Sequence, residues 1–329
     1  MNTENTKQIK NSSGLKEFFT STAGVVLLVT IVLAVAVHII THGNFFTPYN
    51  LATYTRTASF TIIVGAAQTL VLLLGGIDLS VASIAGFSSM VFAMLVLKAG
   101  MNPILAIVIA ILCGLVWGAV NGLFICGLEL PPFIVTLATS QIIRGIIYVA
   151  TKGFPLTGIP AWITVLGQGS LGGLVPYPTI IMIILIIILA FMLKNSSFGR
   201  HIYAVGGNES AARIVGIRTN RTKTGVYALS GMISGLAGVL MVLRMGASQV
   251  NIGETWVMPS ITAAVLGGTS MAGGVGGVWG TLIGGLLMGA ISFSINLLGI
   301  DSYWDNVVTG LVVLIAVSLD AITKKRRAS

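Results

Sequence analysis

The chain has 329 residues, of which 55% are hydrophobic and only 8% are charged, and its mean hydropathy is +0.98. A soluble globular domain carries about 25% charged residues, so this composition excludes a water-soluble fold and predicts an integral membrane protein. The net charge of +9 does not indicate nucleic-acid binding, because the positions of basic residues in a membrane protein report its topology.

The first 21 residues form a polar tail ahead of the first apolar run. No small-residue cleavage site follows that run, so it is not expected to be a removable signal peptide. We therefore expect a cytoplasmic N-terminal tail over residues 1–21, followed by a spanning helix that is retained.

Ten apolar segments follow, and a helix needs about 20 apolar residues to cross about 30 Å of hydrocarbon. The segment at 258–270 has 13 residues, so it is expected either to be re-entrant or to extend upstream through Trp256 and Val257. We predict an all-α, polytopic transmembrane bundle of about ten spans within a permease domain over 22–320. The segments cover residues 22–41, 52–75, 79–98, 102–127, 132–151, 178–194, 224–243, 258–270, 276–298 and 304–320.

Lysine and arginine fix the expected orientation, because loops on the cytoplasmic side carry an excess of both. With both termini in the cytoplasm, the tails, the loop over 195–222 and the residues that flank this loop, Lys194 and Lys223, hold 13 of the 18 basic residues. Only Lys98, Lys152 and Arg244 then lie on the outer side. Residues 321–329 are accordingly predicted to be a basic cytoplasmic tail.

Glycines recur every four residues on two segments, Gly114-Gly118-Gly122 on the fourth and Gly276-Gly280-Gly284 on the ninth. Such rows leave a flat face on which helix backbones approach closely in a membrane. We expect packing within one subunit, while a subunit interface or a mobile pore wall is the alternative.

A short repeat links the two halves, because Leu74-Gly75-Gly76 recurs as Leu266-Gly267-Gly268. Transporters often carry internal repeats with the binding site between them. Leu-Gly-Gly can also recur by chance in a chain with 41 glycines. Both copies are predicted to lie near the cytoplasmic side.

Five polar residues within or beside the apolar segments are candidates for a translocation path. A carboxylate inside a bilayer costs about 2.5–3.5 kcal/mol on insertion scales, so an acid such as Asp78 needs a reason to be there. It can cap the next helix by accepting from backbone N–H groups two or three residues on, or it can take part in translocation. The five candidates are Gln68, Asp78, Asn121, Gln141 and Arg144.

Enzymatic chemistry is not expected of this chain. It contains no Gly-Lys pair and hence no P-loop, and no nucleophile–base set can be argued from its scattered acids. Cys113 and Cys126 lack the spacing of a metal site or redox pair and are expected to be buried core residues. We predict neither a metal site nor a cofactor bound by this chain.

The loop over 195–222 contains a short predicted helix. Asn208 is a good N-cap, Glu209 suits the positive helix N-terminus, and Gly216 can adopt the left-handed conformation at the C-terminal end. About two turns of helix are too short to be stable alone, so the helix is expected to need a partner surface. Packing on its own subunit is the alternative.

At this loop the chain resembles the ribose-type permeases of ATP-binding cassette (ABC) importers. Ordered motifs along most of the chain, from about residue 44 to 320, carry the resemblance. They are Asn44-Phe45-Phe46-Thr47, Gly75-Gly76-Ile77-Asp78-Leu79-Ser80-Val81, the stretch 199–217, Val265-Leu266-Gly267-Gly268-Thr269-Ser270-Met271-Ala272-Gly273-Gly274, and Asn296-Leu297-Leu298-Gly299.

The resemblance implies a permease in the bacterial cytoplasmic (inner) membrane that imports ribose or a related monosaccharide. An extracytoplasmic binding protein would deliver the sugar. A cytoplasmic ATPase carrying ATP and magnesium would drive the import, and the pathway would form between two copies of this chain or between it and a homologous permease. Its ATPase-coupling residues would be Gly207, Asn208, Glu209, Ser210, Ala211, Ala212, Arg213 and Gly216.

A secondary transporter driven by an ion gradient is the alternative. Asp78 would then be the coupling carboxylate, and Asp78→Asn is expected to reduce function. A secondary transporter has no need of a motor-docking helix, so the helix in the loop over 195–222 separates the two hypotheses.

Overall fold

The computed structural model describes residues 22–301 and 303–328, so the tail predicted over 1–21 lies outside the described residues. Each of the ten predicted segments falls on one helix. The helices are α2 (Thr22–Ile40), α3 (Pro48–Leu73), α4 (Val81–Leu97), α5 (Pro103–Gly127), α6 (Pro132–Thr151), α7 (Ala161–Gln168), α8 (Tyr177–Asn195), α9 (Ser197–Gly207), α10 (Glu209–Ile214), α11 (Thr219–Met245), α12 (Val257–Leu266), α13 (Val278–Leu297) and α14 (Trp304–Ala328).

Local sequence explains where several of these helices begin. Proline is the first residue of α3, α5 and α6, where its missing N–H group costs no hydrogen bond. Asn102 also caps α5, because its side-chain oxygen accepts from the Ile104 N–H group at 2.9 Å. These punctuation residues sit at the edges of apolar runs, which is why sequence alone locates the helices well.

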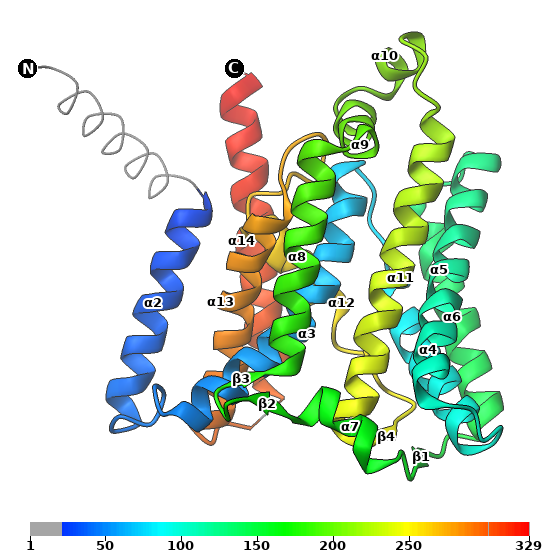
Figure 1. Cartoon of the computed structure of the whole chain (residues 1–329). Coiled ribbons are helices and arrows are strands. Elements are labelled where there is room, and N and C mark those ends of the chain that lie inside the picture. Colours follow the sequence, from blue (N-terminus) through cyan, green and yellow to red (C-terminus); the bar gives the residue numbers. More distant parts are fainter. Residues whose placement is uncertain (1–21, 302, 329) are drawn as a thin grey trace, which may run out of the picture.

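The helices form one bundle with two distinct ends (Figure 1). One end carries α9 and α10 and is called the α10 end; α2 begins there, and α14 runs up to it. The opposite end, called the α7 end, carries α7 and two short antiparallel strand pairs. These strands are β1 (Leu156–Thr157) with β4 (Ala247–Ser248), and β2 (Ser170–Leu171) with β3 (Val175–Pro176).

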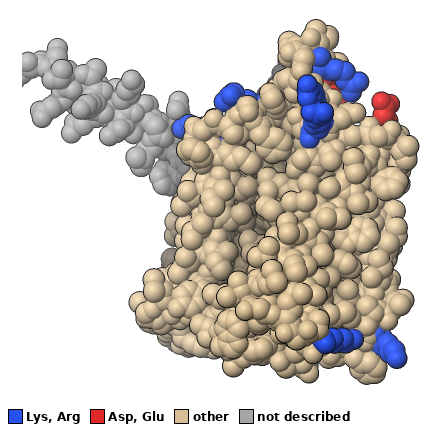
Figure 2. Space-filling view, turned by 45° about the vertical axis from the view of Figure 1, so that its right-hand side comes forward, with Lys and Arg blue, Asp and Glu red and all other residues tan. Residues whose placement is uncertain are grey.

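Among the described residues, seven helices are long and apolar enough to cross a membrane: α2, α3, α5, α6, α8, α11 and α13. Three further apolar helices are shorter, namely α4, α12 and the stretch Trp304–Ile315 of α14. On the face seen in Figure 2, the described Lys and Arg side chains gather at the two ends, and the belt between is uncharged. This distribution is that of a protein whose middle lies in hydrocarbon.

The chain between α3 and α4, residues 74–80, is called the first break. It leaves α3 at the α10 end and runs back into the bundle before α4 begins (Figure 1). Its depth follows from a contact between Asp78 and Ser230, which lies eleven residues into α11 and hence about 16 Å from the start of that helix. The return from the α10 end is therefore non-helical over the first break and helical over α4.

Residues 249–256, between β4 and α12, are called the second break. They start at the α7 end, and α12, only ten residues or about 15 Å long, completes the passage to the α10 end. The segment predicted at 258–270 is therefore not a re-entrant hairpin. It extends upstream to Val257, and the consecutive turns of the second break take the place of the missing helical residues.

The second break packs against the start of α4, directly after the first break. A Cβ atom at Gly253, in the second break, would lie 2.6 Å from the carbonyl oxygen of Ala82, in the first turn of α4. One at Gly86 would lie 3.0 Å from the carbonyl oxygen of Ile252. Discontinuous helices that meet in this way are typical of transporters, where they surround the substrate path.

The glycine rows pack within the chain, as expected. A Cβ atom at Gly114, Gly118 or Gly122 of α5 would run into the backbone of α11. A Cβ atom at Gly280 or Gly284 of α13 would overlap the backbone of α12 and its C-cap residue. These rows therefore bring helix backbones of one subunit into direct contact.

The two Leu-Gly-Gly copies occupy related places but different registers. Each follows the end of a helix, α3 or α12, at the α10 end. The left-handed residue is the first glycine of one copy, Gly75 (φ 77°), and the second glycine of the other, Gly268 (φ 89°). Both copies therefore end a helix with the help of a left-handed glycine, but this glycine is the first of the pair in one copy and the second in the other.

Candidate functional site

The loop over 195–222 contains two helices rather than one. Ser196 caps α9 through a hydrogen bond from the Gly199 N–H group at 2.9 Å, and α9 continues through Gly207. Gly207 is therefore the last residue of α9, which corrects its assignment to the coupling helix. Gly206 stays helical because its Cα packs against the Leu73 carbonyl and Gly274, where no side chain would fit.

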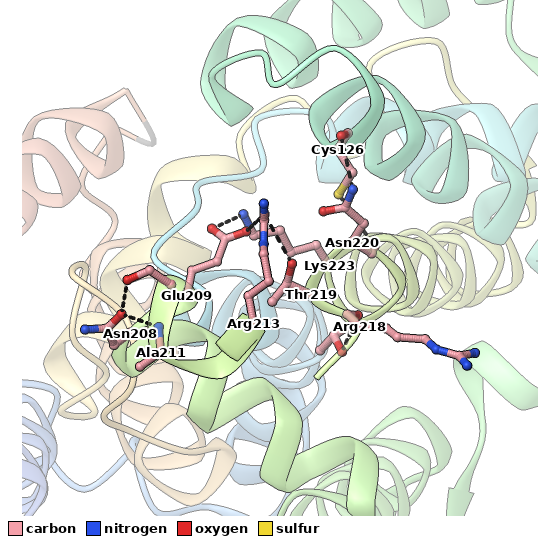
Figure 3. A network of polar contacts seen from close by, with 11 residues as sticks. Cys126, Asn208, Glu209, Ala211, Arg213, Arg218, Thr219, Asn220 and Lys223 are labelled. Atoms are coloured by element: carbon pink, nitrogen blue, oxygen red, sulfur yellow. Dashed lines mark hydrogen bonds and ion pairs between the residues drawn. The ribbon is translucent and has the colours of Figure 1, made fainter. Parts of the chain in front are cut away.

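The second helix, α10, has the caps that the sequence predicts (Figure 3). The Asn208 side-chain oxygen accepts from the Ala211 N–H group at 2.9 Å and from the Ser210 hydroxyl at 2.7 Å. At the other end Gly216 adopts a φ of 87°, and the Ile217 N–H group donates to the Ala212 carbonyl at 3.0 Å. The capping prediction is confirmed, whereas the coupling role of these residues stays a prediction.

Glu209 ties α10 to the first turns of α11 (Figure 3). Its carboxylate pairs with Arg213 at 3.3 Å and with Lys223 of α11. Partial burial would raise the pKa of Glu209, but the hydrogen bond and charge of Lys223, together with Arg213, hold it below its ordinary value. Glu209 is therefore ionised at neutral pH, and the tie weakens only as the pH falls through the lowered pKa.

The tip of α10 exposes apolar side chains that the sequence analysis did not single out. Ile214 is 86% exposed and Val215 is 75% exposed, while Ala212 packs inward. Beside the tip lies a groove of about 900 Å³ between α10 and the turn that joins α5 to α6, lined there by Glu129, Leu130 and Pro132. Exposed apolar residues at a polar end of a membrane protein mark a surface for another protein.

Cys126 also lines this groove, and its thiol lies 3.6 Å from the Asn220 carbonyl. Both Cys126 and Cys113 are partly exposed, so the expectation that they are buried core residues is wrong. The reason is that α5 turns only its glycine face toward the bundle.

Helix α9 contacts the end of α3 and the chain between α12 and α13. The Gly274 N–H group donates to the Leu73 carbonyl at 2.9 Å, and Gly206 lies against both residues. The Tyr203 hydroxyl donates to the Gly276 carbonyl at 2.8 Å. A displacement of α9 would therefore act directly on the end of α3 and on the chain that follows α12.

Three of the five path candidates, Gln68, Asp78 and Asn121, meet in one network that is buried completely. The Asp78 carboxylate accepts from the Ser80 N–H group at 2.8 Å, from the Ser80 hydroxyl at 2.6 Å, and from the Ser230 hydroxyl at 3.2 Å. The Asn121 amide donates to the Ser80 hydroxyl at 2.8 Å.

Gln68 completes this network from α3. With its nitrogen turned toward the Asp78 carbonyl, its amide pairs with the Asp78 backbone on both sides at 3.2 Å. The backbone of the first break, which has no helix of its own to satisfy it, thus finds partners in side chains of the surrounding helices.

Asp78 fixes the first break in the arrangement seen here. It accepts from a backbone N–H group two residues on, as capping predicts, while Ser80 occupies the N-cap position of α4 and makes no side-chain cap bond of its own. The carboxylate is fully buried, so it faces no open path in this conformation. Whether it acts in translocation stays a prediction.

Removing the Asp78 carboxylate is expected to destabilise the bundle, whereas neutralising it is tolerated. Asp78→Ala leaves buried donors of Ser80 and Ser230 without partners, at about 1–3 kcal/mol for each. Asp78→Asn keeps an acceptor for Ser80 and can donate to the Ser230 hydroxyl. In detergent, the melting temperature of Asp78→Ala should lie well below that of Asp78→Asn, which should be close to the wild-type value. Equal melting temperatures for Asp78→Ala and the wild type would contradict this role.

The other two candidates, Gln141 and Arg144, lie apart from that network on α6. The Arg144 guanidinium donates to the Glu254 carboxylate at 2.7 Å and to the Ser83 hydroxyl at 3.4 Å. Ser83 in turn pairs with Ser140 at 2.6 Å. Arg144 therefore joins the first turn of α4 to the second break.

Sequence analysis missed Glu254. The available signal was its isolation, because it is the only acidic residue between Glu209 and Asp301. It follows the apolar run of α11 closely, so it counted as a loop residue. The fold returns that loop into the bundle, where a carboxylate needs a partner.

Comparison with known proteins gives consistent matches. The family model described as "Branched-chain amino acid transport system / permease component" matches residues 50–317. Over 291 residues the chain is 40% identical to the ribose import permease protein RbsC of Bacillus subtilis (strain 168), covering 88% of this chain and 89% of the relative.

Two further relatives have other sugars in their names. The fructose import permease protein FrcC of Rhizobium meliloti is 35% identical over 319 residues, which cover 94% of this chain and 89% of the relative. The D-allose transport system permease protein AlsC of Escherichia coli (strain K12) is 36% identical over 282 residues, which cover 85% and 86%. No solved structure gives a significant match to this chain.

Proposed function

This chain belongs to the branched-chain amino acid transport system / permease component family, as a permease of the sugar ABC importer type, and from that premise we propose how it works. It is the membrane-spanning permease of a binding-protein-dependent importer that brings a monosaccharide into the cytoplasm. A separate ATPase subunit supplies the energy.

We propose that the chain crosses the bacterial cytoplasmic membrane ten times, with both termini inside. The seven long apolar helices are joined by α14 and by two crossings, those of α4 and α12, that the breaks complete. An even number of crossings agrees with α2 beginning and α14 ending at the same end of the bundle (Figure 1). The α10 end also carries the loop over 195–222 with its basic residues, which is expected of the cytoplasmic side.

The proposal for an ATPase partner rests on one observation, the capped helix α10 with its exposed apolar tip. Asn208 and Gly216 fix the two ends of α10, Glu209 ties it to α11, and Ile214 and Val215 project from it. A helix of six residues is not stable without such ties, so we infer that they keep α10 helical for contact with a partner. The backbone contacts of α9 with Leu73 and Gly274 then offer a route into the membrane part.

Ribose or a related monosaccharide is the proposed cargo. Relatives whose names specify ribose, fructose and allose are 35–40% identical to this chain over most of its length. An extracytoplasmic binding protein would deliver the sugar at the α7 end, to a pathway formed by two copies of this permease or by this chain and a homologue.

Reconstitution tests the proposal. Proteoliposomes containing this permease, its candidate ATPase and its binding protein should accumulate one labelled sugar from a panel of pentoses and hexoses, with ATP supplied on the ATPase side and no ion gradient. Uptake should require both ATP and the ATPase, and an ATPase unable to hydrolyse ATP is the matched control.

The result that would contradict the proposal is uptake by this chain alone that follows a proton or sodium gradient and ignores ATP. Such uptake would identify a secondary transporter, and the buried carboxylate of Asp78 would then be the leading candidate for ion coupling.

A further inference from the structure

From Gln141 to its C-terminal end, the exposed surface of α6 divides into a polar face and an apolar face, whereas Ile134 and Leu137, exposed earlier in the same row, are apolar. Gln141, Arg144, Tyr148 and Lys152 follow one another at intervals of three or four residues, so they lie in one row along α6 and its C-cap. The exposed residues beside this row are Ile142, Ile146 and Val149. A helix that met only lipid would be apolar on both faces.

The polar face reaches well into the membrane part. Arg144 lies seven residues before the end of α6 at Thr151, which places its backbone about 10 Å from that end. Gln141 lies a further turn inward. Snorkelling toward the interface does not explain this arginine, because its guanidinium is held instead by Ser83 and Glu254.

Its ion pair with Glu254 is only partly covered by the rest of the chain. The Arg144 side chain is 31% exposed and the Glu254 side chain is 51% exposed. Charges at this depth are strongly disfavoured against hydrocarbon, so the open side of the pair must face water or another protein. The pair also lies where the second break packs against the first turn of α4.

We propose that this face lines the water-filled path of the transported sugar, with Arg144 and Glu254 as groups that bind it. The proposal rests on the proposed function and adds the wall of the pathway to it. A sugar presents hydroxyl groups that both donate and accept, and a guanidinium with several donors beside a carboxylate acceptor matches them. The ring of Tyr148, half-exposed one turn further out, offers an apolar surface to the sugar's C–H groups.

This assignment also separates the predicted path candidates. Gln141 and Arg144 belong to the proposed wall of the pathway, together with Glu254, the partner of Arg144. Gln68, Asp78 and Asn121 are fully buried and hold the first break in place. The path would thus run along the outside of the single chain at α6, where a second permease subunit would close it.

Accessibility of introduced cysteines tests the wall. In the full-length chain with Cys113→Ala and Cys126→Ala, the matched pairs are Tyr148→Cys with Val149→Cys, and Gln141→Cys with Ile142→Cys. Each pair compares neighbouring exposed positions on the polar and the apolar face. A charged, membrane-impermeant methanethiosulfonate reagent should label the polar-face cysteines at least about tenfold faster, because such reagents react with water-exposed thiolate.

Equal rates within both pairs would overturn the proposal. So would polar-face cysteines that resist the reagent and instead form disulfides between two copies, because the face would then be a dry subunit interface. Labelling needs neither ATP nor an ATPase. If the polar-face cysteines are labelled fast but the reconstituted protein fails to import sugar, the proposed function is refuted, whereas the water-lined face is still supported.

Sugar contact is tested separately in the reconstituted importer. The double variant Arg144→Gln/Glu254→Gln removes both charges together, so neither charge is left without its partner. It should raise the KM for sugar uptake, or lower the uptake rate, at least about tenfold. Its protein yield and melting temperature should match those of the wild type. The matched control, Ile142→Gln on the apolar face, should leave sugar uptake unchanged. Wild-type uptake kinetics in the double variant would exclude a sugar-binding role for the pair.

Discussion

Reversing the charge of Glu209 is expected to abolish ATP-driven sugar uptake while leaving the membrane part folded. The carboxylate pairs with Arg213 and Lys223, so Glu209→Lys brings three cations together at the base of α10. Repulsion then releases α10 from α11, and a helix of six residues does not persist once it is released. Uptake in proteoliposomes should fall at least about tenfold, because the ATPase then has no ordered helix to contact.

A charge swap supplies the control. Glu209→Lys combined with Lys223→Glu restores an opposite pair between α10 and α11, and it should recover much of the uptake if the tie itself matters. The melting temperature of the permease in detergent should be nearly the same for the wild type and both variants, because Glu209 lies outside the bundle. Wild-type uptake in Glu209→Lys would show that α10 does not couple transport to the ATPase.

The largest effect on folding is expected from Gly118→Val. A Cβ atom at Gly118 would overlap the Tyr227 carbonyl, and it would lie 3.0 Å from Ala228 Cα. The obstacle is backbone, which cannot change rotamer, so α5 and α11 must separate. Overpacking of a core costs about 1–3 kcal/mol and occasionally more, and the upper end applies when backbone is displaced. We expect little monodisperse protein after detergent extraction, since this loss is a large fraction of the total stability.

Gly127→Val is the matched control on the same helix. Nothing lies within 4 Å of a Cβ atom at Gly127, so this variant adds the same side chain without an obstacle. Its yield and its elution profile in size-exclusion chromatography should match those of the wild type. Equal yields for Gly118→Val and Gly127→Val would mean that α5 and α11 pack less tightly than the structure shows.

The arrangement of the loop suggests how a motor at the α10 end could open a path further in. Through Gly206, helix α9 contacts Leu73, the last residue of α3, and Gly274, which lies in the chain between α12 and α13. The end of α3 leads directly into the first break, and the chain at Gly274 leads back through α12 to the second break. Because the two breaks lack helical hydrogen bonds of their own, they are the parts of the membrane region that can change shape at least cost.

Local signals account for what sequence predicted well. Apolar runs of the right length, proline at the first helical position and an Asn–Gly pair of caps around α10 act through neighbours in the chain, so they can be read without knowing the fold. Local signals did not show that a separate helix, α9, continues through Gly206 and Gly207. Two adjacent glycines favour a break locally, whereas in the fold Gly206 packs against Leu73, which is distant in sequence.

The sequence by itself determined that this protein is a helical membrane permease of the sugar ABC importer type, where its ten apolar helices lie, and that its sequence contains no P-loop. Only the tertiary structure decided that Asp78 is enclosed with Ser230 and that Arg144 meets Glu254, 110 residues away. Composition and periodicity fix which faces are apolar, because those depend on neighbours. The partner of a buried polar group is instead fixed by how the helices and the two breaks pack together.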